Sequence, residues 1–153
     1  MNRVARKYVE YSNGRALLNL CEYIASTVTR IAEVPEGGET AEEGAAWDSA
    51  PTAYGALVEK AANSEGFAMA FKLVCDVLGI ECGVVIGKYN GEPHAWNVVS
   101  LNGDYYHIDP ANCGTKGIAN VFLKSDEEML KEYWWDIEQV KPCRGSLSYY
   151  DIA

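Results

Sequence analysis

Hydrophobic residues recur at helical spacing in two stretches of the chain, residues 16–31 and residues 64–78. In the first stretch, the residues that would share one helix face are Leu17, Leu20, Cys21, Ile24, Val28 and Ile31. In the second stretch they are Phe67, Phe71, Val74, Cys75 and Leu78. Asn63 and Gly79 flank the second stretch and are residue types that favour the N-terminal and C-terminal caps of a helix. The pattern therefore predicts two amphipathic helices.

Residues 33–51 between them are acidic and aperiodic, which predicts a long loop that could act as a lid.

After residue 80 the pattern changes to the alternation that is typical of β-strands. We expect strands at residues 81–89, 94–101 and 104–109. The connections contain Asn90-Gly91 and Asn102-Gly103, and Asn-Gly favours tight hairpins because both central residues adopt positive φ. Helices followed by an antiparallel meander define an α+β fold.

The C-terminal part has weaker patterns. Ser125 and Glu128 have the spacing of a capping box, which predicts a short helix after residue 125. Residues 133–136 (YWWD) are expected to form the packed end of that helix, and the chain after Lys141 is expected to be irregular.

The turn at Asn102-Gly103 fixes a strand register. It pairs Val98 with His107 and Trp96 with Asp109, so these residues and His94 project from one face of the sheet. His94 would lie diagonal to Asp109, about 7–8 Å away between backbones and within side-chain reach. A carboxylate in this position could orient an imidazole.

Ser64 lies at the predicted start of the second helix, where unpaired N–H groups stabilise a thiolate or an oxyanion. Ser64, His94 and Asp109 thus stand in the order nucleophile, base and orienting acid. Each also has a structural alternative: Ser64 as an N-cap, His94 bonded to a backbone carbonyl, and Asp109-Pro110 as a turn that ends a strand. A further alternative is a Zn²⁺ or Fe²⁺ site formed by His94, His107 and Asp109.

Composition narrows the classes of partner. The 153 residues carry a formal net charge of -9, which disfavours nucleic acids and anionic membranes, and no apolar run is long enough for a signal peptide or a membrane span. None of the five cysteines forms a C-x-x-C pair, so a zinc ribbon or a thioredoxin-type site is not indicated. One or two disulfides could form, but the sequence does not say between which cysteines.

Three ordered motifs resemble the bacterial transglutaminase-like superfamily, which has the papain-like fold. They are E-G-F-A after Ser64, H-A-W-N at His94, and Y-Y-H-I-D-P ending at Asp109 and Pro110. The length of the chain suits one domain, so we expect a single domain over residues 1–153. The resemblance covers residues 53–129 and implies a Cys-His-Asp triad, and no cofactor is expected. It selects His94 over His107 as the base and Asp109 as its partner. In the family pattern the residue before E-G-F-A is the catalytic cysteine, and here it is Ser64.

The resemblance implies acyl transfer from a peptide or glutamine carboxamide of a protein to water or to a primary amine. Serine at position 64 indicates an inactive chain, by engineering or by natural loss, with a working serine hydrolase as a third alternative. A binding module on the same fold, holding an extended peptide without chemistry, is the rival function.

The surroundings of the triad are less well defined. The backbone N–H of Ser64 is the expected oxyanion donor. Tyr54 is a weak candidate for the upstream side chain that would supply a second donor. Tyr54 and Trp96 are the candidate substrate contacts, although packing in the sheet is the favoured role for Trp96. The absence of a signal peptide leaves the location undetermined, and we expect either a protein that is not exported or a domain of a longer exported or surface protein.

Overall fold

The computed structural model describes residues 3–32 and 49–153, with side chains from residue 12 onward. The main helices are α1 (Arg3–Thr27) and α3 (Ser64–Leu78), and a short π-helical segment, η1 (Gly55–Glu59), precedes α3. The main strands are β3 (Cys82–Tyr89), β4 (Glu92–Leu101) and β5 (Asp104–Ile108). The shorter elements are β1 (Thr29–Arg30), β2 (Ala61–Ala62), η2 (Pro110–Asn112), α4 (Cys113–Lys116), η3 (Ile118–Asn120), α5 (Asp126–Met129), β6 (Tyr133–Trp134), η4 (Ile137–Gln139) and α6 (Tyr149–Ile152).

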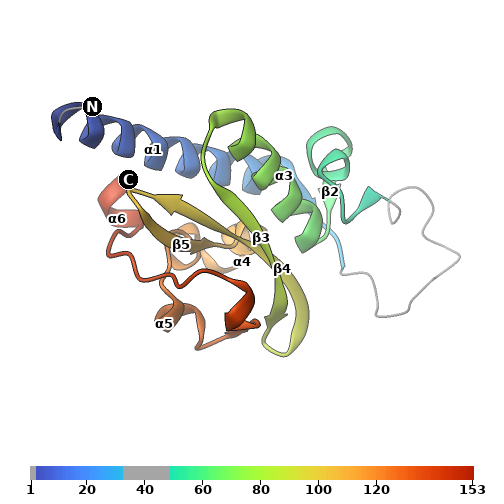
Figure 1. Ribbon diagram of the computed structural model, residues 1–153. Coiled ribbons are helices and arrows are strands. Elements are labelled where there is room, and N and C mark those ends of the chain that lie inside the picture. The colour runs from blue at the N-terminus through green and yellow to red at the C-terminus, as the bar shows by residue number, and fades with distance from the viewer. Residues whose placement is uncertain (1–2, 33–48) are drawn as a thin grey trace, which may run out of the picture.

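The strands form an antiparallel sheet in the order β5-β4-β3-β6, and β1 pairs with β2 in a separate parallel pair. Helix α3 packs on β3 and β4, and α1 packs against α3 (Figure 1). Alternate residues of β4 therefore face two different cores. Val99 and Leu101 join the core with the helices, whereas Trp96 and Val98 join a smaller aromatic core with Tyr133 and Trp135. The α+β prediction is confirmed.

The two amphipathic helices are present, with differences at their ends. Helix α1 begins well before residue 16 and ends at Thr27, and Ile31 lies beyond it, after β1. Leu78 was expected on the buried face of α3 but is 49% exposed. Cys75 is the last residue of α3 in the buried core, so the last turn of the helix extends beyond the core side chains that would cover Leu78.

The hairpin between β4 and β5 has the predicted register, with Leu101 opposite Asp104 and Val98 opposite His107. Asn102 and Gly103 both have positive φ, as the Asn-Gly turn requires. The ladder ends at the pair Asn97 and Ile108. The expected pairing of Trp96 with Asp109 is therefore not formed, because the chain leaves the sheet after Ile108 and enters η2.

The segment YWWD is not the end of a helix, contrary to the prediction. The capping box of Ser125 and Glu128 is present, but the helix that it starts ends at Met129. Tyr133 and Trp134 instead form β6 and pair with Tyr89 and Lys88 of β3. This pairing is a contact between distant segments, which the local pattern could not show. Most of the expected lid-like loop, residues 33–48, lies outside the described residues.

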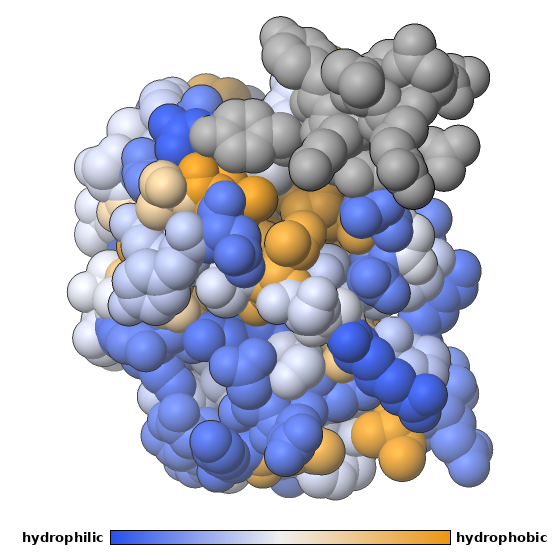
Figure 2. Space-filling view, turned by 90° about the vertical axis from the view of Figure 1, so that its left-hand side faces the viewer, coloured by the Kyte–Doolittle hydropathy of each residue, from blue (hydrophilic) through white to orange (hydrophobic). Residues whose placement is uncertain are grey.

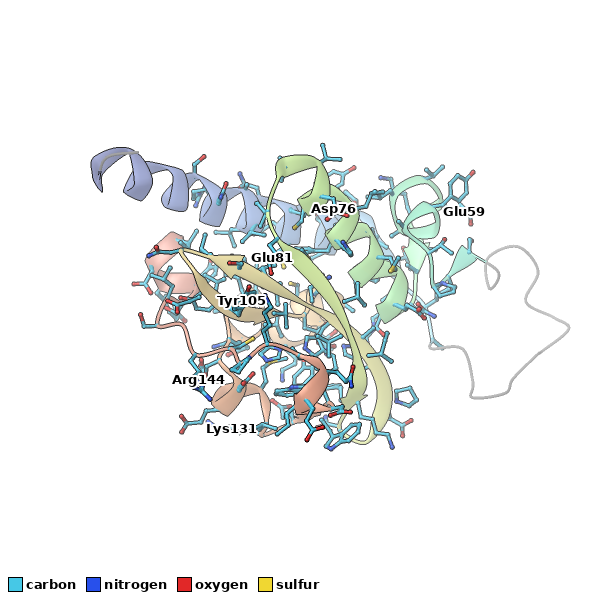
Figure 3. All side chains as sticks on the ribbon, viewed as in Figure 1. Glu59, Asp76, Glu81, Tyr105, Lys131 and Arg144 are labelled. Carbon is cyan, nitrogen blue, oxygen red and sulfur yellow. The ribbon has the colours of Figure 1, made fainter. Side chains whose placement is uncertain are left out.

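The C-terminal segment returns along the sheet. Tyr105 of β5 lies close to Glu81 and donates a hydrogen bond to it at 2.9 Å (Figure 3). Lys141 donates to the Tyr105 hydroxyl at 2.8 Å. The chain then ends in α6, which the sequence analysis did not predict and which buries Ile152. The last part of the chain is thus attached to the sheet through Lys141 and to the main core through Ile152.

Gly66 of α3 marks a close approach between two segments. A Cβ atom at this position would overlap the carbonyl oxygen of Ala50 and would lie 2.7 Å from the Cβ of Ala62. Only glycine therefore allows the segment before α3 to lie directly on the first turn of the helix.

The face of the protein drawn in Figure 2 is largely hydrophilic, with a smaller group of hydrophobic side chains near its centre. Among the described residues, no helix is both long enough and apolar enough to cross a membrane.

Candidate active site

Ser64 occupies the first position of α3, directly after the residue that caps the helix. The cap is Asn63, whose side-chain oxygen accepts a hydrogen bond from the N–H of Gly66 at 3.1 Å. The alternative role of Ser64 as an N-cap is therefore wrong. Its Oγ instead accepts a hydrogen bond from the N–H of Ala95 on β4 at 3.0 Å, and the residue is 1% exposed. The start of α3 is thus attached to β4 beside His94.

His94 projects from β4 toward Asp109, at the end of the strand that β5 leaves unpaired. Its Nε2 lies 2.8 Å from Oδ2 of Asp109, and both side chains are buried. The imidazole stacks on Trp96 with ring centroids 6.2 Å apart and has Tyr89 on another side at 5.6 Å. The diagonal relation predicted from the hairpin is therefore a direct contact.

The carboxylate of Asp109 receives further hydrogen bonds. Its Oδ2 accepts from the side-chain amide of Asn112 at 2.8 Å and from the hydroxyl of Tyr133 at 2.5 Å. Burial, together with the negative charge of Asp109, raises the pKa of Tyr133, so its hydroxyl stays a donor at neutral pH. The other oxygen, Oδ1, is buried and has no hydrogen-bond partner among the described residues. The carboxylate is thus held firmly at one oxygen.

Three residues of this network were missed by the sequence analysis: Arg30, Asn112 and Tyr133. Arg30 of β1 donates to the amide oxygen of Asn112 at 2.6 Å, which fixes the amide so that its nitrogen faces Asp109. Asn112 follows Asp109 by three residues, so a turn after the strand was a usable signal. Arg30 and Tyr133 come from distant segments, and no local pattern points to them.

Two of the three predicted triad residues, Ser64 and His94, line one small hollow. A pocket of about 120 Å³ is lined by Asn63, Ser64, Glu65, Ile86, Pro93, His94 and Ala95. Asp109 lies behind His94 and is not exposed. Two larger hollows, of about 350 Å³ and 170 Å³, contain none of the triad residues. The chemistry of the smaller pocket, rather than its size, makes it the candidate site.

The two candidate substrate contacts have different positions. Trp96 is fully buried under the imidazole of His94, where it supports the ring instead of facing solvent. Tyr54 is 59% exposed and does not line the pocket. Ile86, which is 65% exposed and lines the pocket, is an apolar side chain that a bound molecule could reach.

A second histidine–carboxylate pair, formed by His107 and Asp126, has its imidazole on the same face of the sheet. Nδ1 of His107 accepts a hydrogen bond from the indole N–H of Trp96 at 3.0 Å, and Nε2 lies 2.7 Å from Asp126. Burial lowers the pKa of His107, and the hydrogen bond to Asp126 offsets part of this effect. His107 therefore has its own carboxylate and does not share Asp109.

This arrangement bears on the metal alternative. Within residues 3–32 and 49–153, the His, Cys and acidic side chains that converge closely enough to hold a metal are His107, Asp126 and Cys143, not His94, His107 and Asp109. Because Trp96 donates to Nδ1 of His107, Nε2 carries the proton and donates it to Asp126. Burial, with the charge of Asp126, raises the pKa of Cys143 to about 12, so its thiol stays protonated. His107 and Asp126 are thus hydrogen-bonded to each other, and this group differs from the one that the sequence suggested.

Comparison with known proteins places the chain in a family. The profile of the transglutaminase-like superfamily matches residues 10–110, more than half of the chain, so the protein belongs to this superfamily. No curated protein matches the chain.

Two solved structures are similar to the chain. One is the crystal structure of a TGase, with 18% identity and a TM-score of 0.51 over 72% of this chain and 33% of that chain. The other is a protein from Cytophaga hutchinsonii provisionally assigned as a cysteine protease, with 21% identity and a TM-score of 0.47 over 72% of this chain and 34% of that chain. The chain thus spans about one third of each of these structures. The first comparison, together with the family match, confirms the transglutaminase-like, papain-like fold.

Proposed function

We propose that the chain carries a transglutaminase-like site for acyl transfer, with position 64 as the nucleophile, His94 as the base and Asp109 as its orienting partner. We further propose that serine at position 64 leaves this site inactive on amides. The observation that carries the proposal is the buried contact of 2.8 Å between His94 and Asp109, beside a helix N-terminus whose first residue is Ser64.

The protonation of His94 follows from its partners. A carboxylate only accepts hydrogen bonds, so Nε2 carries the proton and donates it to Asp109. The amide nitrogen of Asn112 lies 3.4 Å from Nε2, but both atoms are then donors, and the amide bonds to Asp109 instead. In the neutral ring, Nδ1 therefore keeps the lone pair that a general base needs.

A sulfur atom at position 64 would gain from this environment. The N–H of Ala95, which donates to Ser64 Oγ at 3.0 Å, would donate to a thiolate, and the positive end of the α3 dipole would favour the anion. His94 would take the proton from the thiol and later give it to the leaving amine. A serine hydroxyl is far less acidic, so the same surroundings do not produce its anion before substrate binds.

The substrate class that we propose is a peptide bond or a glutamine carboxamide presented by a peptide or protein. Attack from position 64 would give a covalent acyl intermediate, and water or a primary amine would release it. Hydrolysis is the simpler outcome because water needs no second binding site.

A second candidate function is a binding module without chemistry. It is favoured by one observation, which is that Ser64 is 1% exposed and serves as an acceptor for the backbone of β4. In this role the hydroxyl would link α3 to the sheet, and an extended peptide would occupy the neighbouring surface near Ile86.

The test is thiol labelling of the Ser64→Cys variant. The variant and the parent chain are treated with iodoacetamide between pH 5 and 9, and the modified peptides are mapped. We expect the thiol introduced at position 64 to react rapidly near pH 6, and His94→Ala in the same variant to abolish this reactivity. Cys143 serves as an internal control because its pKa of about 12 makes it slow throughout this range.

His107→Asn is the matched control for His94→Ala, since it removes the other buried histidine from the same face of the sheet. It should leave the labelling near pH 6 unchanged. If the thiol introduced at position 64 reacts no faster at pH 6 than an ordinary thiol, the triad does not operate and the binding module is the better reading.

A further inference from the structure

Two buried cysteines from distant parts of the chain meet beside the turn that carries Asp109. Sγ of Cys21 on α1 lies 2.6 Å from Sγ of Cys113, the first residue of α4. They are 92 positions apart in sequence, and they are 0% and 5% exposed. The sequence is compatible with one or two disulfides and does not say between which cysteines, and the fold brings these two together.

We propose that Cys21 and Cys113 form a disulfide when the chain folds in the presence of a disulfide oxidant. The sulfur atoms of a disulfide are about 2.05 Å apart, so closing the bond requires a movement of only about half an ångström. Both residues lie in the main core, so neighbouring side chains already hold the two thiols together.

The other cysteines are less suited to a stabilising bond. Cys75 and Cys82 are also neighbours, but they would close a loop of only a few residues, whereas Cys21 and Cys113 would close most of the described chain. Cross-links that close longer loops remove more entropy from the unfolded chain. The thiol of Cys143 lies beside His107 and Asp126, the cluster described above, which contains no second cysteine.

The reaction balances with a small disulfide such as oxidised glutathione. The thiolate of one cysteine attacks a sulfur of the oxidant, forming a mixed disulfide and releasing one glutathione thiolate. The thiolate of the second cysteine then attacks the first and releases the other glutathione. The protein loses two protons and two electrons, and the oxidant is reduced to two thiols.

The surroundings indicate when this exchange takes place. The hydrogen bond with Cys113 and burial raise the pKa of Cys21, and neither sulfur is accessible to an oxidant in the folded chain. Exchange is therefore slow once the protein is folded. We expect the bond to form during folding, while the thiols are still exposed, and then to be protected from reductants.

The bond would act on the turn that carries Asp109 of the proposed triad. Cys113 follows Asp109 by four residues, and its Sγ lies 3.7 Å from the backbone oxygen of Asp109. A disulfide would join this turn to α1, and Arg30, which is close after α1, already bonds to Asn112 of the turn. The inference does not depend on the chemistry at position 64, because it concerns only the two thiols.

Trypsin makes the test unambiguous. Cleavage after Lys and Arg places Cys21 on residues 16–30, Cys113 on residues 89–116, and both Cys75 and Cys82 on residues 73–88. The full chain is refolded in a buffer of oxidised and reduced glutathione, remaining thiols are blocked with iodoacetamide, and the digest is analysed by mass spectrometry without reduction. A cross-link between residues 16–30 and 89–116 reports the proposed bond alone.

We expect this cross-linked peptide to be the main disulfide product, with a mass two hydrogens below the sum of its parts. The oxidised chain should unfold at a Tm roughly 10 °C above that of the reduced chain. The Cys143→Ser variant should retain both properties, whereas the double variant Cys21→Ala/Cys113→Ala should lose both. The inference is overturned if the products link other cysteines, if no disulfide forms, or if reduction leaves the Tm of the parent unchanged. The first measurement needs no variant, so a variant that fails to fold does not affect it.

Discussion

The protein contains two histidine–carboxylate pairs with buried imidazole rings, and they look alike when only their distances are compared. His94 lies 2.8 Å from Asp109, and His107 lies 2.7 Å from Asp126. Both histidines project from the same face of the β4-β5 hairpin, and Trp96 contacts both rings. A short distance between an imidazole and a carboxylate therefore does not identify a catalytic pair.

The two pairs differ in what the second ring nitrogen meets. For His107 it is the indole N–H of Trp96, which uses the lone pair that a base would need. His94 instead lines the pocket beside Ser64, at the N-terminus of α3. His107 therefore has both ring nitrogens engaged by the fold, whereas our proposal assigns the second ring nitrogen of His94 to proton transfer.

The largest difference between the pairs is expected in thiol reactivity. In the Ser64→Cys background, Asp109→Ala should lower the rate of alkylation at pH 6 roughly 10²-fold, because the thiol returns toward its ordinary pKa of about 8.5. Asp126→Ala should change that rate less than about twofold. Iodoacetamide labelling with mass spectrometry measures both rates. Equal losses from the two variants would show that the pairs are not distinct in function.

The next difference is in stability. Asp109 is 0% exposed, so Asp109→Ala should lower the free energy of unfolding by about 3–5 kcal/mol, since the groups that bond to the carboxylate lose their buried partner. The side chain of Asp126 is 30% exposed, so Asp126→Ala should cost about 1–2 kcal/mol because water can replace the carboxylate. Urea unfolding followed by circular dichroism gives both values. If Asp126→Ala lowered the free energy of unfolding more than Asp109→Ala, the pair of His94 and Asp109 would not be the more buried of the two.

Trp96→Phe tests the shared contact. The variant keeps an aromatic ring under His94 but removes the donor to His107, which should lower the free energy of unfolding by about 1–2 kcal/mol. In the Ser64→Cys background the labelling near pH 6 should change less than about twofold. A complete loss of labelling in a folded Trp96→Phe variant would mean that the indole N–H, through His107, also supports the proposed base.

The smallest effect is expected in the dependence of stability on pH. Burial lowers the pKa of His107 in the folded chain, so as pH falls below the ordinary value of 6.5 the unfolded chain binds the proton first. The free energy of unfolding therefore decreases in this range, and the contribution is fully present only above it. His107→Asn removes the titrating group and should give a shallower decrease between pH 7.5 and pH 5, measured by urea unfolding. An unchanged slope would mean that His107 does not contribute to the acid sensitivity.

The parts of the fold that were predictable depend on local chemistry. Helix α3 was recognised from the spacing of its apolar residues between Asn63 and Gly79, and the hairpin register followed from Asn102-Gly103. That register was enough to predict that His94 lies within reach of Asp109. It was not enough to choose between His94 and His107, because both face the same side and the spacing treats them alike.

The remaining features depend on contacts between distant segments. Strand β6 is two residues long and exists because it pairs with β3, so the pattern of YWWD alone suggested a helix end. Arg30 reaches Asn112 from β1, and Cys21 reaches Cys113 from α1, across most of the chain. Such contacts leave no periodic signal in the sequence, so neither the reach of Arg30 to Asn112 nor the thiol pair could be predicted.

The close approach at Gly66 has a consequence for how proteins of this kind are recognised. The glycine of the E-G-F-A motif is required because the segment around Ala50 packs against the first turn of α3. This requirement is the same whichever residue occupies position 64. Selection for folding alone would preserve this glycine in any protein with the same packing, whether or not it catalyses acyl transfer. A glycine at this position therefore reports the close packing at the start of α3, and by itself it does not report whether position 64 carries a nucleophile.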